Sequence, residues 1–325
     1  MARASRGAIA DDGRVRVFVA GASGAIGRPL VRQLVAASHD VTGMTRRQSA
    51  AEEIRGDGAA AVVCDVFDTE ALGRAVTDAS PDVLVHQLTA LPYRIDPRKA
   101  DTYPATSRLR TEGTANLLAA ARAAGARRFV SQSIAFLYAP RGPMIVDEGA
   151  PALENLGGHL GEAMEATLSG ERQVLTADGV EGIVLRYGYF YGPGTSFAPD
   201  GSMAEDIRRR RFPIVGSGAG TMSLVHVEDA AAATVAACER GAPGIYNVCD
   251  DDPAPMREWI PVYADAIGAK PPFRVPVWLA RVAAGKSIVR MATELRGASN
   301  AKAKRELGWE PRYPSWRQGF ADALG

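Results

Sequence analysis

The segment at residues 21–27 constrains the fold more than any other part of the sequence. It reads Gly-Ala-Ser-Gly-Ala-Ile-Gly and lies between an apolar run at 15–20 and a helical pattern at 29–37. Glycines at such a turn let the backbone approach a pyrophosphate, whose charge then lies on the helix N-terminus. The spacing G-x-x-G-x-x-G differs from the common G-x-G-x-x-G fingerprint. It predicts a dinucleotide-binding loop, with an ordinary tight turn as the alternative; the binding residues would be Gly21, Ser23, Gly24, Ala25, Ile26 and Gly27.

Short apolar runs alternate with helical patterns over most of the chain. We expect strands at 15–20, 40–45, 61–64, 83–87, 128–131, 182–186, 225–227 and 245–248, and helices at 29–37, 68–78, 111–124 and 161–176. This alternation is typical of a parallel sheet with helices on both faces. With 325 residues, 46% of them hydrophobic, the chain can bury a large core. The predicted fold class is α/β, a doubly wound parallel Rossmann sheet with a smaller, discontinuous C-terminal substrate lobe.

The composition of the sequence changes after residue 191. Glycine and proline clusters occupy 192–199 and 216–220, and prolines break the helical segments beyond residue 253. Loops that long in a compact fold are usually functional. We therefore expect an N-terminal tail at 1–14, an NAD(P)-binding Rossmann domain at 15–191 and 222–249, and a substrate-binding lobe at 192–221 and 250–325.

Charge and cysteine content exclude several classes of function. The 38 basic and 37 acidic residues give a net charge of +1, so no nucleic-acid or membrane partner is expected. Cys64, Cys238 and Cys249 form no CxxC pair, so we expect no disulfide and no structural zinc. The first residues lack the apolar core of a secretory signal, so we expect a cytoplasmic protein. The sequence is compatible with a homodimer but does not set the oligomeric state.

The residues after the second and third predicted strands bear on the choice of cofactor. An NAD-preferring site places an acid about 20 residues beyond the glycines, to bind the ribose hydroxyl. Here Arg46 and Arg47 stand at that place, and guanidinium groups suit a 2′-phosphate. NADP(H) is therefore the preferred cofactor and NAD(H) the alternative, unless both arginines only form a solvated loop. Asp65 and Val66 could hold the adenine edge, or form a surface turn.

Several further segments carry patterns that occur together in one family. They are CDV at 64–66, VLVHQLTA at 83–90, EGTANLLAAARAAGARRFV at 112–130, LRYGYFYGPGT at 185–195, VHVEDAA at 225–231 and YNVCDD at 246–251. With the glycine loop, they make the chain resemble an extended, atypical short-chain dehydrogenase/reductase of the NAD-dependent epimerase/dehydratase family. The resemblance covers about residues 15 to 324. It implies that Gln87, Leu88, Thr89 and Tyr187 line the cofactor.

The chain departs from that family at the catalytic residues. The family uses a Ser or Thr with a Tyr-x-x-x-Lys pair, in which the lysine lowers the pKa of the tyrosine. No Tyr-x-x-x-Lys occurs here, and no lysine lies between Asp101 and Ala269. By resemblance, the tyrosine and lysine positions fall near Ala163 and Thr167, and Arg110 stands where the family has asparagine.

Two residues are the main candidates for catalysis, and a proton could also come from His159, Glu162, Tyr189 or Tyr191. Ser133 occupies the family's catalytic serine position by resemblance, and Tyr138 follows in the same loop as a candidate for the missing phenol. The alternatives are that Ser133 caps the end of a strand and that Tyr138 packs beneath the loop. His86 and His226 are expected to be core or strand-end histidines.

Three functions compete at this point. The first is an NADP(H)-dependent oxidoreductase acting on a carbonyl or alcohol of a small molecule, with a non-standard proton donor. The second is a sugar-nucleotide epimerase or dehydratase, which is weakened by the missing tyrosinate. The third is a non-catalytic NADP(H) sensor. An arginine run at 208–211 hints at an anionic substrate, whereas Phe197, Phe212, Trp259 and Trp278 equally suit an apolar one.

Overall fold

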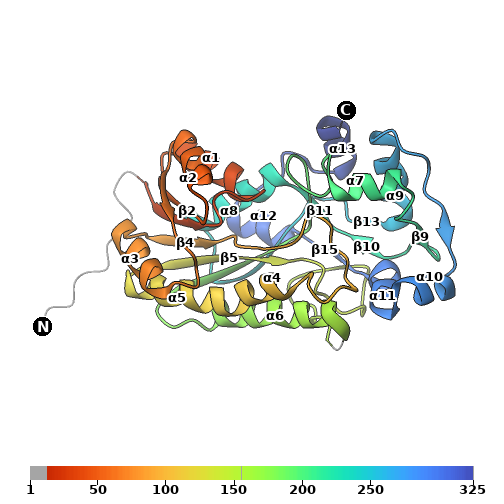
Figure 1. Ribbon diagram of the computed structural model, residues 1–325, viewed down its shortest axis with the longest axis horizontal. Coiled ribbons are helices and arrows are strands. Elements are labelled where there is room, and N and C mark those ends of the chain that lie inside the picture. Colours follow the sequence, from red (N-terminus) through yellow and green to blue (C-terminus); the bar gives the residue numbers. More distant parts are fainter. Residues whose placement is uncertain (1–12, 155, 325) are drawn as a thin grey trace, which may run out of the picture.

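A seven-stranded parallel sheet forms the centre of the protein (Figure 1), as the sequence predicts. The computed structural model describes residues 13–154 and 156–324, so most of the predicted tail, residues 1–12, lies outside the described residues. The strand order is β12-β7-β5-β4-β1-β2-β3. Its strands are β1 (Arg16–Ala20), β2 (Asp40–Thr45), β3 (Ala60–Val63), β4 (Val83–His86), β5 (Arg128–Ile134), β7 (Glu181–Tyr187) and β12 (Gly244–Val248).

The order of the strands reverses between β1 and β4, since β1 pairs with β2 on one side and with β4 on the other. In open α/β sheets, ligands bind beyond the carboxyl ends of the strands at this point. Residues 21–27 follow β1 and residues 87–90 follow β4. The predicted glycine loop and the predicted cofactor-lining residues therefore meet at the same edge of the sheet.

Helices cover both faces of the sheet (Figure 1). One hydrophobic core lies under α1 (Gly27–Ala36) and α8 (Val227–Glu239), and the other lies under α3 (Thr69–Ala79) and α5 (Thr114–Ala123). Helix α6 (Gly158–Leu175) packs beside α5 and against β5 and β7. Helix α2 (Gln48–Gly56) was not predicted; its polar sequence shows only a short apolar stripe, of which Ile54 is buried.

The predicted helix at 111–124 begins earlier in the structure than expected. Helix α4 (Pro104–Arg108) continues through η1 (Leu109–Gly113), a single stretch of π-helix, into α5. Gly170 of α6 packs against η1, because a Cβ there would lie 2.5 Å from the Arg110 carbonyl oxygen. Extra-residue π turns are frequent at functional sites.

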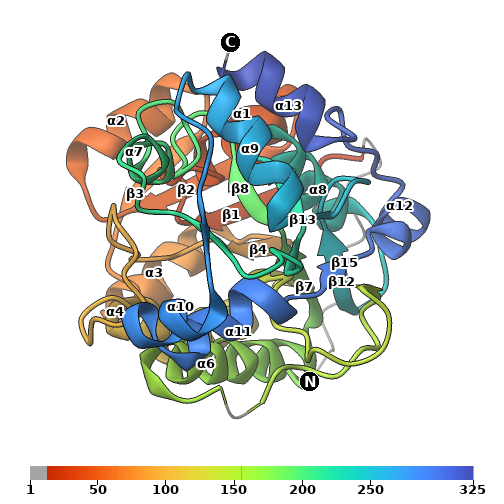
Figure 2. The ribbon, with the colours of Figure 1, turned by 90° about the vertical axis from the view of Figure 1, so that its right-hand side faces the viewer.

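A third core joins segments that lie far apart in the sequence (Figure 2). It is built around Trp259, Tyr263, Trp316 and Phe320, so Phe197 and Trp259 are packing residues here, whereas Trp278 is 69% exposed. The remaining elements of the structure are β6 (Ile145–Val146), β8 (Tyr189–Tyr191), α7 (Ser202–Arg208), β9 (Ile214–Val215), β10 (Thr221–Met222), β11 (Leu224–His226), β13 (Ala254–Pro255), α9 (Met256–Ala266), β14 (Arg274–Val275), α10 (Val277–Ala284), α11 (Lys286–Glu294), β15 (Gly297–Ala298), α12 (Ala301–Leu307) and α13 (Trp316–Leu324).

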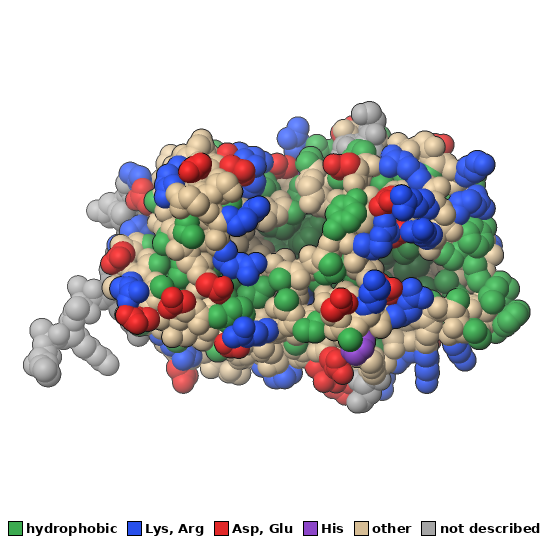
Figure 3. Space-filling model, viewed as in Figure 1, with side chains coloured by type: hydrophobic (Ala, Val, Ile, Leu, Met, Phe, Trp, Pro, Cys, Tyr) green, Lys and Arg blue, Asp and Glu red, His purple; other side chains and the backbone are tan. Residues whose placement is uncertain are grey.

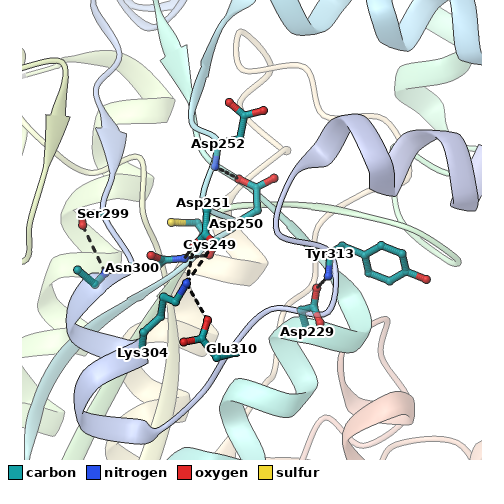
Figure 4. Close-up of polar contacts among 11 residues, drawn as sticks. Asp229, Cys249, Asp250, Asp251, Asp252, Ser299, Asn300, Lys304, Glu310 and Tyr313 are labelled. Atoms are coloured by element: carbon teal, nitrogen blue, oxygen red, sulfur yellow. Dashed lines mark hydrogen bonds and ion pairs between the residues drawn. The ribbon is translucent and has the colours of Figure 1, made fainter.

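Acidic side chains fasten the C-terminal segment back onto the sheet (Figure 4). Lys304 of α12 pairs with Asp251 at 3.1 Å and with Glu310 at 2.7 Å. Asp229 of α8 accepts the backbone N–H of Tyr313 at 3.0 Å.

Among the described residues, no group of three His, Cys, Asp or Glu side chains is placed to hold a metal. The structure leaves all three cysteines free and buried. No helix in the described ranges is long and apolar enough to cross a membrane.

A buried ion pair links α6 to the sheet. Glu171 accepts from Arg186 of β7 at 2.8 and 2.6 Å, and each side chain is 5% exposed. The same carboxylate accepts the hydroxyl of Ser133 at 2.5 Å. Arg186 also lies over the ring of Tyr138, 5.0 Å from its centroid. Three elements and both predicted catalytic residues thus converge on one pair of charges.

Replacing Glu171 by alanine leaves the Arg186 guanidinium buried without a counter-charge. We expect the free energy of unfolding to fall by about 3–5 kcal/mol, measured by urea denaturation. Glu162→Ala on the exposed side of the same helix is the control and should change stability by less than about 0.5 kcal/mol. Equal stabilities of the two variants would contradict the structural role of the pair.

Candidate cofactor and substrate site

Contacts with neighbouring backbone fold the glycine loop tightly. Gly21 has φ +94° and packs against the end of β4, where a Cβ would lie 2.8 Å from the Gln87 carbonyl carbon. A Cβ on Gly27 would overlap the Gly21 carbonyl oxygen and lie 2.7 Å from the carbonyl carbon of Ala22. Gly24 differs, because its Cβ would meet only the Gly21 oxygen, at 3.4 Å. Two of the glycines are therefore required by the loop itself.

Part of the loop is open to solvent. Gly24 and Ala25 are exposed, and Ser23 is partly buried with its hydroxyl 3.2 Å from that of Thr45 at the end of β2. Ile26 is 5% exposed and packs in the core, so only its backbone can face a ligand. The exposed loop lies directly before α1, whose first N–H groups can meet a pyrophosphate.

The predicted adenosine-side residues lie at the ends of β2 and β3. Arg46 and Arg47 follow β2 directly and are exposed. Asp65 is also exposed, and its carboxylate accepts the N–H of Phe67 at 3.0 Å. Val66 is buried, so only its backbone could approach a ligand. The structure thus brings these residues to the same edge of the sheet as the glycine loop.

The residues after β4 and β7 differ in what they present. Thr89 is exposed and Leu88 is partly buried. Gln87 is buried and donates to the Tyr187 hydroxyl at 3.0 Å. That hydroxyl lies 2.7 Å from the hydroxyl of Thr234 in α8. The Tyr187 side chain therefore belongs to the core, and its predicted contact with a cofactor could be made only by its backbone.

The two candidate catalytic hydroxyls donate to different partners. Ser133 is 3% exposed and donates to Glu171, as described above. Tyr138 is 2% exposed and donates to Asn247 of β12 at 2.6 Å. Burial raises the pKa of Tyr138 to about 12. Their roles in proton transfer stay predictions, and in this structure each hydroxyl has a separate structural partner.

The two strand-end histidines and the two other candidate tyrosines are buried or partly buried. Burial lowers the pKa of His86 to about 4, and its Nδ1 accepts the Leu88 N–H at 3.2 Å. His226 caps α8, with its Nδ1 3.2 Å from the Glu228 nitrogen. Burial raises the pKa of Tyr189 and of Tyr191 above their ordinary values.

The positions of the missing pair lie on α6. Ala163 is 5% exposed and Thr167 is 3% exposed. The guanidinium of Arg110 donates to the Thr167 hydroxyl through Nη1. The sequence shows that Arg110 replaces an asparagine, but it carries no signal that pairs this residue with a position 57 residues later.

A loop after β4 contacts α7 and the segment before it. Arg94 pairs with both Glu205 and Asp206 of α7, and Tyr93 donates to the Asp200 carbonyl at 2.8 Å. Figure 3 shows that this face of the molecule is hollowed between the region of α2 and the region of α7. The hollow lies beyond the carboxyl ends of the strands, where a ligand is expected.

The arginine run at 208–211 is mostly engaged within the protein. Arg208 and Arg210 donate to backbone carbonyl groups, and Arg209 pairs with Glu205 at 2.6 Å. These contacts weaken the hint of a phosphate-bearing substrate that the sequence carries.

Known proteins resemble this chain along nearly its whole length. The family model described as "NAD dependent epimerase/dehydratase family" matches residues 17–249. A Streptomyces protein, 3-diazoavenalumate denitrifying reductase, is 47% identical over 94% of this chain and 99% of its own length. The 4-hydroxy-2-methyl-3-oxo-4-farnesyl-3,4-dihydroquinoline-1-oxide ketoreductase of Stigmatella aurantiaca is 30% identical over 95% of this chain and 96% of its own. The structure of Thermus thermophilus UDP-glucose 4-epimerase with NAD superposes with a TM-score of 0.71 at 22% identity, over 95% of this chain and 97% of that one.

The chain belongs to the NAD-dependent epimerase/dehydratase family, which confirms the resemblance inferred from the sequence. Its relatives include reductases that match it from end to end. The protein is therefore an oxidoreductase of a family that depends on a nicotinamide dinucleotide. Its exposed glycine loop and the strand ends beside it fit such a cofactor.

Gly24 offers a test of the loop that does not disturb its folding. Gly24→Val should abolish NADPH binding, because the branched side chain would occupy the space of the pyrophosphate. Fluorescence titration with NADPH measures binding, and the melting temperature checks the fold. Gly73→Val, at a helical glycine with nothing within 4 Å of its Cβ position, is the control and should bind normally. Retained NADPH binding by the Gly24 variant would show that the loop does not hold the cofactor.

Proposed function

We propose that the protein is an NADPH-dependent reductase that replaces the diazo group of a small aromatic acid by hydrogen and releases N₂. The relative named for the denitrification of 3-diazoavenalumate carries this proposal, because it is 47% identical and spans both chains. The missing Tyr-x-x-x-Lys pair supports the proposal independently, because loss of a diazo group needs no proton donor of that kind.

The choice of NADPH rests on the end of β2. Arg46 and Arg47 are exposed there, and neither guanidinium has a hydrogen-bond or ion-pair partner among the residues that the structure describes. No carboxylate stands at this strand end to bind a ribose hydroxyl or repel a phosphate. Both guanidinium groups are therefore available for a 2′-phosphate, which they can bind through charge-assisted hydrogen bonds.

The chemistry of a diazo group fits a site without a tuned phenol. The bound nicotinamide supplies a hydride. A carbonyl that accepts hydride also needs a proton on its oxygen, and a positioned acid accelerates that step by about 10²–10⁴-fold. An aryl diazonium ion that accepts hydride at its terminal nitrogen becomes an aryldiazene, Ar–N=N–H. The C–N and N–H bonds of the aryldiazene then break, N₂ leaves, and the hydrogen from nitrogen forms the new bond to the ring carbon. Atoms and charge balance without a proton from the protein.

The residues of the site support the same conclusion. Ala163 and Thr167 cannot exchange a proton near neutral pH. The Tyr138 hydroxyl is committed to Asn247, and burial raises its pKa to about 12. The protein would then act by binding and orienting its substrate and by excluding water, which can supply a large share of a rate enhancement.

Reduction of a carbonyl is the second candidate. It is favoured by the Stigmatella ketoreductase, which matches 95% of this chain at 30% identity. Such a reaction would draw its proton from Tyr138, from Ser133 or from water. The two candidates differ in their dependence on Tyr138.

We expect wild-type protein to bind NADPH at least about tenfold more tightly than NADH, since hydrogen bonds to charged groups contribute about 1.5–3 kcal/mol. Arg46→Ala and Arg47→Ala should each weaken NADPH binding and leave NADH binding unchanged. Arg55→Ala, at an exposed arginine of α2, is the matched control. Isothermal titration with both cofactors measures these affinities. Equal affinities in the wild type would remove the basis for NADPH preference.

Turnover distinguishes the two candidate reactions. With NADPH, the protein should convert 3-diazo-4-hydroxybenzoate into 4-hydroxybenzoate and N₂, one NADPH being consumed per product, as followed by absorbance and mass spectrometry. Tyr138→Phe should keep this rate within about twofold, because no phenol takes part.

Turnover of a carbonyl panel without any diazo reduction would favour the second candidate, and Tyr138→Phe should then lower kcat by about 10²-fold or more. Tight NADPH binding without turnover of either class would favour a sensor.

A further inference from the structure

Arg110 carries a positive charge that the proposed reaction does not use. It belongs to η1, the π-helical stretch between α4 and α5. Its backbone abuts α6 at Gly170, and its side chain runs along α6 to Thr167, about one turn nearer the N-terminus of that helix. As a residue Arg110 is partly buried, and the Nε atom of its guanidinium is buried, so the charged group is screened from bulk water.

The guanidinium does not use all of its donors. Nη1 donates to the Thr167 hydroxyl. Nε is buried and has no partner in the described part of the chain. The second terminal nitrogen likewise makes no hydrogen bond to any described residue. An arginine has five N–H donors and no acceptor, so unused donors at a partly buried site favour a bound anion.

The position of the group within the site is informative. Thr167 stands near the lysine position of the family, and Ala163, one turn further along α6, stands near the tyrosine position. A guanidinium bonded to Thr167 therefore lies close to the place of the missing ammonium group. The methyl group of Ala163 fills much less space than a phenol. The structure thus keeps a positive charge where the family has one, but without the proton donor.

We propose that Arg110 binds the anionic oxygen next to the reacting atom of the substrate, which in a diazo acid of the proposed class is the ring oxygen ortho to the diazo-bearing carbon. The inference rests on the proposed function for the identity of the substrate. The interaction neutralises the oxygen and positions the diazo group, but it transfers no proton.

The charged and titratable neighbours of Arg110 are compatible with this role. Burial lowers the pKa of Arg110 to about 10, while Glu171 and Tyr103 act in the opposite direction, so the group stays charged near neutral pH. Burial raises the pKa of Tyr103 to about 12. Burial lowers the pKa of His86 to about 4, so this histidine adds no competing positive charge. Glu171 is already held by Arg186 and Ser133.

A nitrophenol can report on this contact without turnover. In 4-hydroxy-3-nitrobenzoate, the nitro group takes the place of the diazo group, and the phenol ionises near neutral pH with a change in visible absorbance. Bound to wild-type protein with NADP⁺, its phenol pKa should fall by about one unit or more, because tenfold tighter binding of the phenolate equals one pKa unit. The methyl ether, 4-methoxy-3-nitrobenzoate, should bind at least about tenfold more weakly. Equal binding of the two probes to the wild type would overturn the proposal even if no variant folds.

Variants then assign the effect to Arg110. Arg110→Gln should abolish the shift of the phenol pKa while keeping NADPH affinity within about twofold, and Arg110→Lys should keep part of the shift. Arg108→Gln, at an exposed arginine paired with Glu112, is the control and should behave as the wild type.

Two results would overturn the inference: an unchanged phenol pKa shift in Arg110→Gln, or a loss of NADPH affinity in that variant, which would place Arg110 on the cofactor. The probe assay needs no turnover. A shift that depends on Arg110, in a protein that does not reduce a diazo compound, would uphold this contact and reject only the proposed reaction.

Discussion

The ion pair between Glu171 and Arg186 is the interaction on which the rest of the site depends. The pair joins α6 to β7, and its carboxylate accepts a hydrogen bond from the hydroxyl of Ser133 on β5. Its guanidinium lies over the ring of Tyr138. Two charges buried to this degree are stable only while each satisfies the other. The pair therefore fixes the distance between α6 and the sheet, and with it the place where the Arg110 side chain reaches Thr167.

This arrangement changes what the shared fold can do. The same sheet and glycine loop serve epimerases, dehydratases and reductases, so the fold alone does not choose the reaction. Here the hydroxyl groups of Ser133 and Tyr138 are bonded to structural partners, whereas the Arg110 guanidinium has donors without a partner among the described residues. On the proposed function, such a site stabilises negative charge on a substrate and moves no proton, and an electrophile that releases N₂ suits it better than an unactivated alcohol.

Much of this could be predicted from the sequence, for physical reasons that differ by element. The strand at 40–45 is matched residue for residue by β2. The strand at 15–20 is matched by β1 except at its first residue, because its nearly continuous apolar run is typical of a buried parallel strand. Helix α2 was missed because its apolar stripe is short, and the helix containing η1 starts earlier than its apolar pattern does. The glycine loop could be read from local spacing. The orientation of Tyr138 and the contact between Arg110 and Thr167 depend on packing between distant segments, which no local pattern encodes.

The packing of the glycine loop also limits what a glycine motif can tell about any relative of this chain. Gly21 and Gly27 are excluded from carrying a side chain by neighbouring backbone alone, whether or not a ligand is ever bound. A descendant that had lost its cofactor would still have to keep both in order to fold. Only Gly24, which has room for a Cβ, is free to drift once binding is no longer under selection. Among duplicated or silent copies of such proteins, that single position is the one whose identity records whether a dinucleotide is still in use.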